Sequence, residues 1–275
     1  MSILCTYSGS VRHRPHCKSS DNTIRRPKKK RMPLKLEVAL DEDILELIRV
    51  KWRAFENPPQ GILRIFYPII DNDYEKSIKI AAEKELAEYR EKRPEVMYVK
   101  VIDTDNGNKI VGGSKWWFYQ RNPFENNDQP AEAAWYPEGI ARRYVTEAMH
   151  QAEAGHHRMA QRPHAYLNIA FTDPDYQRCG VGQLFLEWGI KRADELQLES
   201  WVDSSAAGFK LYQKNGFIKV ADGGYGPIKP EGLTAEEEAK WAELEALIPP
   251  TAHPVMWRPL GGKYIEGETV KPWET

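Results

Sequence analysis

The chain has 275 residues, with 39 Lys and Arg against 40 Asp and Glu, and 41% of its residues are hydrophobic while 29% are charged. This composition is typical of a soluble globular protein that is long enough to bury a sizeable core. We expect no membrane helix, which needs about 20 apolar residues, and no secretory signal, and three cysteines without zinc-site spacing favour a reducing intracellular compartment.

Residues 1–31 form a basic leader. They hold nine Lys and Arg against Asp21 alone, so the rest of the chain carries an excess of nine negative charges. Such polar, basic sequence is typical of disorder, and its run Arg25–Arg31 is a nuclear-import signal, a nucleic-acid arm or a solvated tail. The acidic body argues against a broad nucleic-acid footprint. We expect a cytoplasmic protein, or a nuclear one through this run, and Met32 is an alternative start.

The first half of the body alternates strands and helices. Apolar and polar residues alternate over residues 34–40, which predicts a strand, and Asp41 is the expected N-cap of the amphipathic helix that follows. The Asn-Gly pair between two later β-type segments predicts a hairpin. The elements predicted here are strand 34–40, a helix after Asp41, a helix from about Asp73 to Lys92, and strands Val96–Asp103 and Lys109–Tyr119.

A long excursion over residues 120–143 precedes the second half, and a loop of this length is usually functional or mobile. Thr234 and Glu237 form a capping-box pattern for a late helix. The predicted elements are helix Arg143–Ala160, strand Tyr166–Thr172, helix Val181–Gln197, strand Glu199–Asp203, helix Ala206–Asn215, strand Phe217–Ala221, a helix to about Leu247 and strand Val255–Arg258. This order predicts an α/β fold, in which one mixed α+β sheet carries helices on both faces.

The segment QRCGVG, residues Gln177–Gly182, lies between a buried strand and a long helix. Its two glycines let the backbone turn sharply, and the helix start offers unpaired N–H groups and a positive dipole end. With Arg178 this predicts an anion site that suits phosphate. A Walker loop fails because Gln183 follows Gly182, and a dinucleotide fingerprint fails at Phe185. A plain strand-to-helix turn is the alternative interpretation.

Two segments together resemble the GNAT superfamily of acyl-CoA N-acyltransferases. QRCGVG fits the Q/R-x-x-G-x-G/A pattern of that family, and GFKLYQKNGF, residues 208–217, resembles its second motif, a helix ending in L-Y-x-K-x-G-F. The match keeps order and spacing from Tyr166 to Val220 and looks most like uncharacterised fungal members. The resemblance implies a GNAT-like fold for one N-acetyltransferase domain over 32–275, with an insertion at about 120–160 and a C-terminal extension from about 222.

The resemblance also implies which residues bind acetyl-CoA as co-substrate. Strand residues would hold its pantetheine arm through their main chains, and the loop would wrap its pyrophosphate. These residues are Ile169, Ala170, Phe171, Thr172, Gln177, Arg178, Cys179, Gly180, Val181, Gly182, Gln183 and Ser205. Ser205 stands where many members carry Asn, and a hydroxyl makes fewer hydrogen bonds than an amide. Cys179 is interpreted as a loop residue, because the family transfers the acyl group directly.

Tyr212 matches the tyrosine that in many members faces the CoA sulfur and protonates the departing thiolate. A phenol with a pKa of about 10 can supply that proton and regain it from water. The alternative is a tyrosine that packs in the core of an amphipathic helix. The resemblance thus implies Tyr212 as the catalytic acid.

The general base of the histone-acetylating members is missing, because Tyr166 occupies its position on the central strand. The attacking amine must still lose a proton. The candidates are an ordered water chain and four residues in or near the insertion: Glu138, His156, His157 and His164. We expect no metal, because the histidines lack Cys or carboxylate partners at fixed offsets.

A group of aromatic residues frames the insertion. Aromatic side chains at a strand end either wall an acceptor pocket or fill the core on alternate faces of the strand. They are Trp116, Trp117, Phe118, Tyr119, Trp135 and Tyr136.

The leading hypothesis is therefore direct transfer of an acetyl group from acetyl-CoA to an amine. A small-molecule amine suits an acidic body that attracts cations, and a protein lysine or N-terminal amine is the alternative acceptor. A non-catalytic acyl-CoA-binding protein would fit the missing carboxylate, and a nucleic-acid-binding protein would rest on Arg25–Arg31 alone. We expect no membrane partner, and the oligomeric state stays open.

Overall fold

A computed structural model of the chain describes residues 33–125 and 131–274, so the expected basic leader lies outside the described residues. The helices are α1 (Ile44–Glu56), α2 (Ile62–Phe66), α3 (Tyr74–Lys92), α4 (Ile140–Met159), α5 (Val181–Glu195), α6 (Phe209–Lys214) and α7 (Ala235–Leu247). The strands are β1 (Leu34–Val38), β2 (Val96–Asp103), β3 (Lys109–Tyr119), β4 (His164–Thr172), β5 (Glu199–Asp203), β6 (Ile218–Tyr225) and β7 (Thr251–Arg258). In these two ranges, no helix combines the length and apolar character that crossing a bilayer requires.

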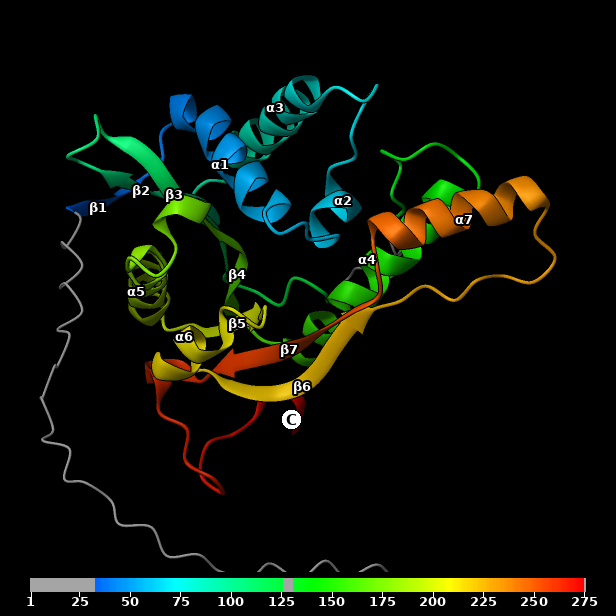
Figure 1. Cartoon of the computed structure of the whole chain (residues 1–275). Coiled ribbons are helices and arrows are strands. Elements are labelled where there is room, and N and C mark those ends of the chain that lie inside the picture. Colours follow the sequence, from blue (N-terminus) through cyan, green and yellow to red (C-terminus); the bar gives the residue numbers. More distant parts are fainter. Residues whose placement is uncertain (1–32, 126–130, 275) are drawn as a thin grey trace, which may run out of the picture. The chain divides into compact units, whose positions relative to one another are not determined.

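One seven-stranded sheet has the order β1-β2-β3-β4-β5-β7-β6 (Figure 1). Neighbouring strands are antiparallel except for β4 and β5, which are parallel and are connected through α5. The predicted hairpin of β2 and β3 is confirmed, with Val96 opposite Trp117 and Asp103 opposite Lys109. The mixed α/β sheet predicted from the order of elements is therefore present.

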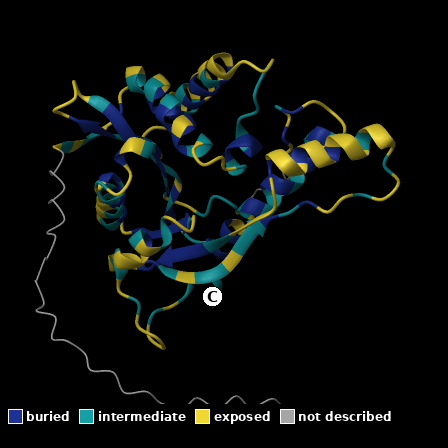
Figure 2. Ribbon diagram, in the orientation of Figure 1, coloured by how far each residue is buried: buried dark blue, intermediate teal, exposed yellow. Residues whose placement is uncertain are grey.

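Helices cover both faces of this sheet, as expected. α5 packs on one face through a core that includes Phe185 and Trp116, and α1 and α3 pack on the other through a core that includes Leu47. Successive side chains of a strand point to opposite faces, so Trp117 joins the second core while Trp116 joins the first. Figure 2 shows the buried residues along the strands and on the helix sides that cover them.

The sheet opens between β4 and β5. Tyr166 is the last residue of β4 that pairs with β5, where it lies opposite Trp201. From there to Thr172, β4 pairs only with β3 among the described strands, and a bulge leaves Asn168 without a partner in β3. One edge of the central strand is therefore unpaired over its second half.

The insertion and the C-terminal residues both contribute to the sheet's surroundings. α4 lies within the insertion between β3 and β4 and packs on β6 and α7. Gly155 lets α4 approach β7, since a Cβ there would lie 2.7 Å from Cγ2 of Val255. β7 runs from Thr251 and lies between β5 and β6. The C-terminal residues from about 222 therefore supply the end of β6 and the whole of β7 to the sheet.

The start of the first helix differs from the prediction. The sequence predicts Asp41 as an N-cap, but Asp41 is the first residue of a 3-10 turn, Asp41–Asp43, that leads into α1 at Ile44. This prediction was wrong, and the Asp41 carboxylate pairs with Arg90 of α3 at 2.7 Å. The capping box of Thr234 and Glu237 at the start of α7 is confirmed. The short helix α2 was not expected, since five residues carry too little periodicity.

Candidate active site

The second half of β4 supplies the backbone that the sequence assigns to a pantetheine arm. Residues Ile169 to Thr172 lie opposite Lys115 to Gly112 of β3, and no other described strand pairs with them. Ala170 packs on the α5 side and Phe171 is buried on the α1 side, so the side chains fill the core as expected. The N–H and C=O groups of the free edge can pair with an extended, amide-bearing ligand, as a strand would.

A short 3-10 turn, Pro174–Tyr176, connects β4 to the glycine-containing loop. Asp173 before it is buried and pairs with Arg53 of α1 at 2.6 Å. Tyr176 is also buried, and its hydroxyl donates a hydrogen bond of 2.9 Å to Asp103 at the end of β2. Contacts from α1 and the hairpin therefore hold the start of the loop in place.

The loop Gln177–Gly182 has the backbone that its glycines predict. Gly180 caps α5 with a φ of 98°, and Arg178 has a φ of 62°. A Cβ on Gly180 would meet no atom within 4 Å, so this residue faces open space. Within the described part of the chain, the backbone N–H groups of Arg178, Gly180, Val181 and Gly182 have no hydrogen-bond acceptor. Four free donors at a helix start suit a diphosphate.

Gln183 does not belong to this group of free donors. Its N–H donates to the carbonyl of Gly180 at 3.1 Å, and its side chain donates to Asn215 after α6 at 3.1 Å. Its side chain thus connects α5 to the end of α6, and its contact with a pyrophosphate stays a prediction of the resemblance. Cys179 is a free, partly exposed thiol that contacts the carbonyl of Gln177 at 3.5 Å, as a loop residue would.

α6 holds Tyr212 against the α5 side of the sheet. Its side chain is 7% exposed, and its ring packs on Phe217 with centroids 5.8 Å apart. Gly208 makes room for the ring, because a Cβ there would lie 2.6 Å from Cε2 and 3.3 Å from the hydroxyl. Burial raises the pKa of Tyr212, so the phenol keeps its proton at neutral pH.

Ser205 is exposed, and its Oγ accepts from the N–H of Gly208 at 3.2 Å, which shapes the start of α6.

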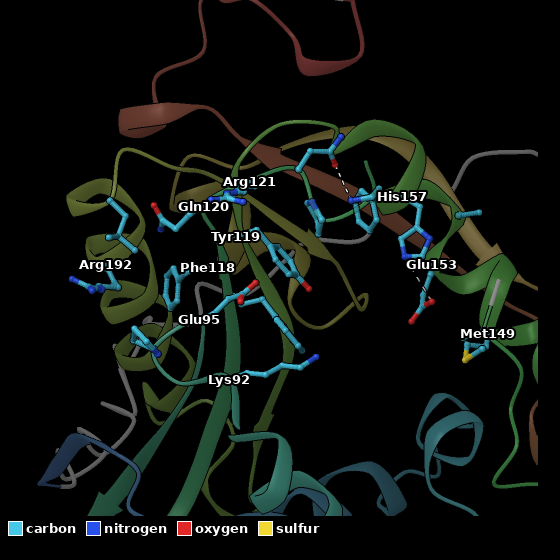
Figure 3. A pocket seen from close by; sticks show the side chains of 18 of the residues that line it. Lys92, Glu95, Phe118, Tyr119, Gln120, Arg121, Met149, Glu153, His157 and Arg192 are labelled. Carbon is cyan, nitrogen blue, oxygen red and sulfur yellow. Dashed lines mark hydrogen bonds and ion pairs between the residues drawn. The ribbon is translucent and has the colours of Figure 1, made fainter. Parts of the chain in front are cut away.

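A cavity of about 1230 Å³ lies between α4 and the open end of the β2–β3 hairpin, where β2 begins and β3 ends (Figure 3). Trp117 and Tyr119 line it, with their rings stacked at 5.2 Å, whereas Trp116 is fully buried in the core on the other face. Trp116 therefore fills the core, whereas an acceptor-pocket role for Trp117 and Tyr119 stays a prediction. Trp135 and Tyr136 lie elsewhere and donate to backbone carbonyls of α2.

The cavity walls carry two carboxylates that have no Lys or Arg partner among the described residues. Glu95 lies just before β2, and Glu153 projects from α4 beside His157, at 3.8 Å (Figure 3). Burial and the charge of Asp203 raise the pKa of Glu153 to about 7. A carboxyl group with this pKa can accept a proton at neutral pH.

The four base candidates from the sequence lie in different surroundings. Glu138 is exposed and lies 3.4 Å from Arg142, and His157 lines the cavity. His156 and His164 are buried with their Nε2 atoms 2.8 Å apart, and burial lowers the pKa of both, that of His164 to about 4. This pair is therefore neutral. Over residues 33–125 and 131–274, no three His, Cys, Asp or Glu side chains gather as a metal site requires.

Tyr166 stands at the family's base position but acts as a donor. Its hydroxyl donates to Oδ2 of Asp203 at 2.9 Å, and burial together with the Asp203 charge raises the pKa of Tyr166. The second oxygen of Asp203 lies 3.4 Å from Nε2 of His253. Sequence patterns do not indicate a site role for Glu153, Asp203 and His253, because these residues come from α4, β5 and β7 and share no local pattern.

A family model and a known protein each match part of the chain. The sequence model described as "Acetyltransferase (GNAT) domain" matches residues 118–225. A protein from Ajellomyces capsulatus named "Probable acyltransferase SID5" is 39% identical over 44 residues, which are 16% of this chain and 32% of that protein. The match thus spans about a third of that relative's length.

Two solved structures align with most of the chain. One, described as histone acetyltransferase HPA2 and related acetyltransferase from Corynebacterium glutamicum, has a TM-score of 0.48 and 19% identity over 82% of this chain and 96% of that one. The other, the paiA N-acetyltransferase from Thermoplasma acidophilum in complex with coenzyme A, has a TM-score of 0.41 and 13% identity over 83% and 99%. The family match includes both the glycine-containing loop and α6, so this part of the chain is similar to a GNAT acetyltransferase domain.

Proposed function

We propose that the protein transfers an acetyl group directly from acetyl-CoA to the amine of a small molecule. The observation that carries the proposal is the row of unpaired backbone groups from the free edge of β4 to the N–H groups of Arg178–Gly182. This edge fits the amides of a pantetheine arm, and the loop fits the diphosphate. The similarity of residues 118–225 to a GNAT acetyltransferase domain supports an acyl-CoA donor.

The two ends of β4 give donor and acceptor separate approaches. The loop follows Thr172 at one end, and Tyr119, which lines the cavity, lies opposite His164 at the other. A thioester lying along the free edge would be next to Tyr166, where backbone N–H groups can polarise its carbonyl. An amine from the cavity would reach the same point, and holding both partners there lowers the barrier by proximity.

The cavity supports a small-molecule acceptor. Its volume of about 1230 Å³ slightly exceeds the range of small-ligand sites, about 300–1,000 Å³. The carboxylates of Glu95 and Glu153 can pair with an amine, and the ring of Tyr119 adds an aromatic wall. The cations Lys92, Arg121 and Arg192 also line the cavity, so attraction of a cationic amine would come from these two carboxylates and not from the net charge of the lining. A lysine or N-terminal amine of a protein is the alternative acceptor.

A thiol-release assay with acetyl-CoA tests this function. We expect release with small primary amines such as spermidine and tyramine, and much less with peptides that carry a lysine or a free N-terminus. Release with peptides alone would reassign the acceptor to a protein. Binding of acetyl-CoA by calorimetry without release for any acceptor would identify a non-catalytic acyl-CoA-binding protein.

Replacing Tyr212 by Phe should lower kcat about a hundredfold while leaving acetyl-CoA affinity nearly unchanged, because only the proton donor for the sulfur is lost. The ring keeps its packing on Phe217 and Gly208. Steady-state kinetics and calorimetry measure the two quantities. Tyr225→Phe, at a buried tyrosine beside α4 and α7, should keep the wild-type kcat. An unchanged kcat in Tyr212→Phe would mean that Tyr212 only packs in the core and does not donate the proton.

A further inference from the structure

The acceptor amine must lose its proton near the point where β4 and β5 part. Tyr166 is the last paired residue of β4, and Asp203 is the last residue of β5. Tyr212 packs with Val202 on the α5 side of the sheet, whereas Tyr166 packs with Trp201 on the α4 side. A proton acceptor for the amine is therefore expected on the α4 side, across the sheet from the proton donor for the sulfur.

Asp203 is held at this point by residues from two other strands. Tyr166 donates to its Oδ2 at 2.9 Å. Its Oδ1 is buried without a hydrogen-bond partner among the described residues and faces Nε2 of His253 at 3.4 Å. Gly223 of β6 makes room for that imidazole, since a Cβ there would lie 2.7 Å from Nε2. These contacts hold a partly buried carboxylate at the end of β5.

Glu153 is a carboxylate on the wall of the acceptor cavity. It lines the cavity from α4, and Tyr119 lines it from β3 (Figure 3). Its neighbour His157 lies at 3.8 Å on the same helix, and burial lowers the pKa of this imidazole, so it adds no positive charge at neutral pH. Burial of Glu153 and the negative charge of Asp203 both disfavour a negative charge on Glu153 and so make that carboxylate more basic.

We propose that Glu153 is the general base that takes a proton from the acceptor amine, and that Asp203 is a positioning residue that acts through it. This inference rests on the proposed acetyl transfer. Glu153 takes the extra proton of the acceptor's ammonium group, and the nitrogen lone pair that this frees forms a bond to the acetyl carbon. A second N–H proton of the nitrogen then leaves to water. The carbon–sulfur bond breaks, and the sulfur takes the proton of Tyr212. Both side chains return to their starting state by proton exchange with water, and the products are an amide and the CoA thiol.

Glu153→Gln tests the base with two acceptors, spermidine, which is protonated at neutral pH, and hydroxylamine, which is largely neutral. We expect kcat/KM for spermidine to fall about a hundredfold and that for hydroxylamine to fall much less, because its nitrogen carries no extra proton. Acetyl-CoA affinity by calorimetry should stay unchanged. Glu138→Gln, at an exposed residue that precedes the same helix, should keep wild-type kinetics.

Asp203→Asn tests the positioning role through the pH dependence. The groups that face Glu153 or Asp203 are His150, His157, Tyr119, Tyr166 and His253. The wild-type kcat/KM for spermidine should rise with pH through an inflection near 7, where Glu153 loses its proton. Without the charge of Asp203 this inflection should move to lower pH by about one unit.

Three results would overturn the inference. Undiminished activity of Glu153→Gln with spermidine, an equal loss for both acceptors, or an unmoved inflection in Asp203→Asn would each remove the base assignment and leave acetyl transfer intact. A wild-type protein that binds acetyl-CoA but releases no thiol with either amine would overturn both the inference and the proposed function.

Discussion

Gly180→Asp should weaken acetyl-CoA binding more than a hundredfold in calorimetry. Gly180 caps α5 and faces open space, so its new carboxylate would stand where the free N–H groups of the loop receive a diphosphate. Two like charges about 5 Å apart repel by about 3 kcal/mol at an effective dielectric constant of about 20. Each 1.4 kcal/mol, roughly, corresponds to a tenfold change in affinity.

Gly180→Asn is the matched control, because it separates the charge from the backbone effect. Asn and Asp have similar shapes, and both tolerate the left-handed conformation that the φ of 98° requires better than other side chains do. We expect the Asn variant to lose only a few-fold in affinity. The ratio between the two variants should shrink at high salt, as screening weakens the repulsion. Equal affinities would contradict an anion at this loop.

The loop could be predicted from the sequence because its determinants are local. Gly180 and Gly182 stand between a strand and a helix that each have a clear apolar pattern, and the structure gives Gly180 the positive φ that only such a residue adopts easily. The hairpin around Asn106 and Gly107 and the segment β4–α5–β5 follow from equally local signals. The order of these elements was enough to predict a mixed sheet.

The cavity and its carboxylates could not be predicted, because packing between distant segments creates them. Glu153 becomes basic only where α4 meets Asp203 at the end of β5, and His253 reaches the same point from β7. The hydrogen bond between Gln183 and Asn215 at the end of α6 is likewise a contact between distant segments that the local motif does not indicate. Local patterns therefore predict backbone geometry better than they predict side-chain partners.

Glu85→Gln should lower the free energy of unfolding by about 3–5 kcal/mol, which is typical for removing one member of a buried ion pair. Glu85 of α3 is 5% exposed, and its carboxylate lies 2.8 Å from Nζ of Lys115 and 3.4 Å from Nζ of Lys51. The hydroxyls of Tyr67 and Tyr98 donate to the same carboxylate. The amide would leave the buried ammonium group of Lys51 without its carboxylate partner, and Lys115 would keep Glu88 alone. Urea unfolding monitored by circular dichroism measures the loss.

Glu88→Gln is the control for this variant. Glu88 also pairs with Lys115, but its side chain is 31% exposed, so water screens the pair. Such pairs contribute about 0–1 kcal/mol, and we expect a loss in that range. If both variants lost the same amount, the buried cluster would owe its stability to something other than the Glu85 charge.

The pH dependence of unfolding distinguishes a missing charge from a packing defect at Glu85. Burial alone would raise the pKa of Glu85, but Lys51 and Lys115 outweigh it and lower that pKa from 4.5 to about 2. The unfolded chain therefore binds more protons between these values, and wild-type stability should fall as the pH drops from 4.5 toward 2, a loss that the variant lacks.

On the alkaline side, burial lowers the pKa of Lys51 from 10.5 to about 8, although Glu85 counteracts this effect. The unfolded chain binds more protons between these values, so stability rises with pH there. Without Glu85 the pKa of Lys51 should fall further, and the pH range over which stability rises then begins at lower pH. Glu85→Gln should thus regain more stability from pH 7 to pH 9 than the wild type gains, measured as urea midpoints. A variant midpoint that stays constant over this range would contradict an unpaired, buried ammonium group.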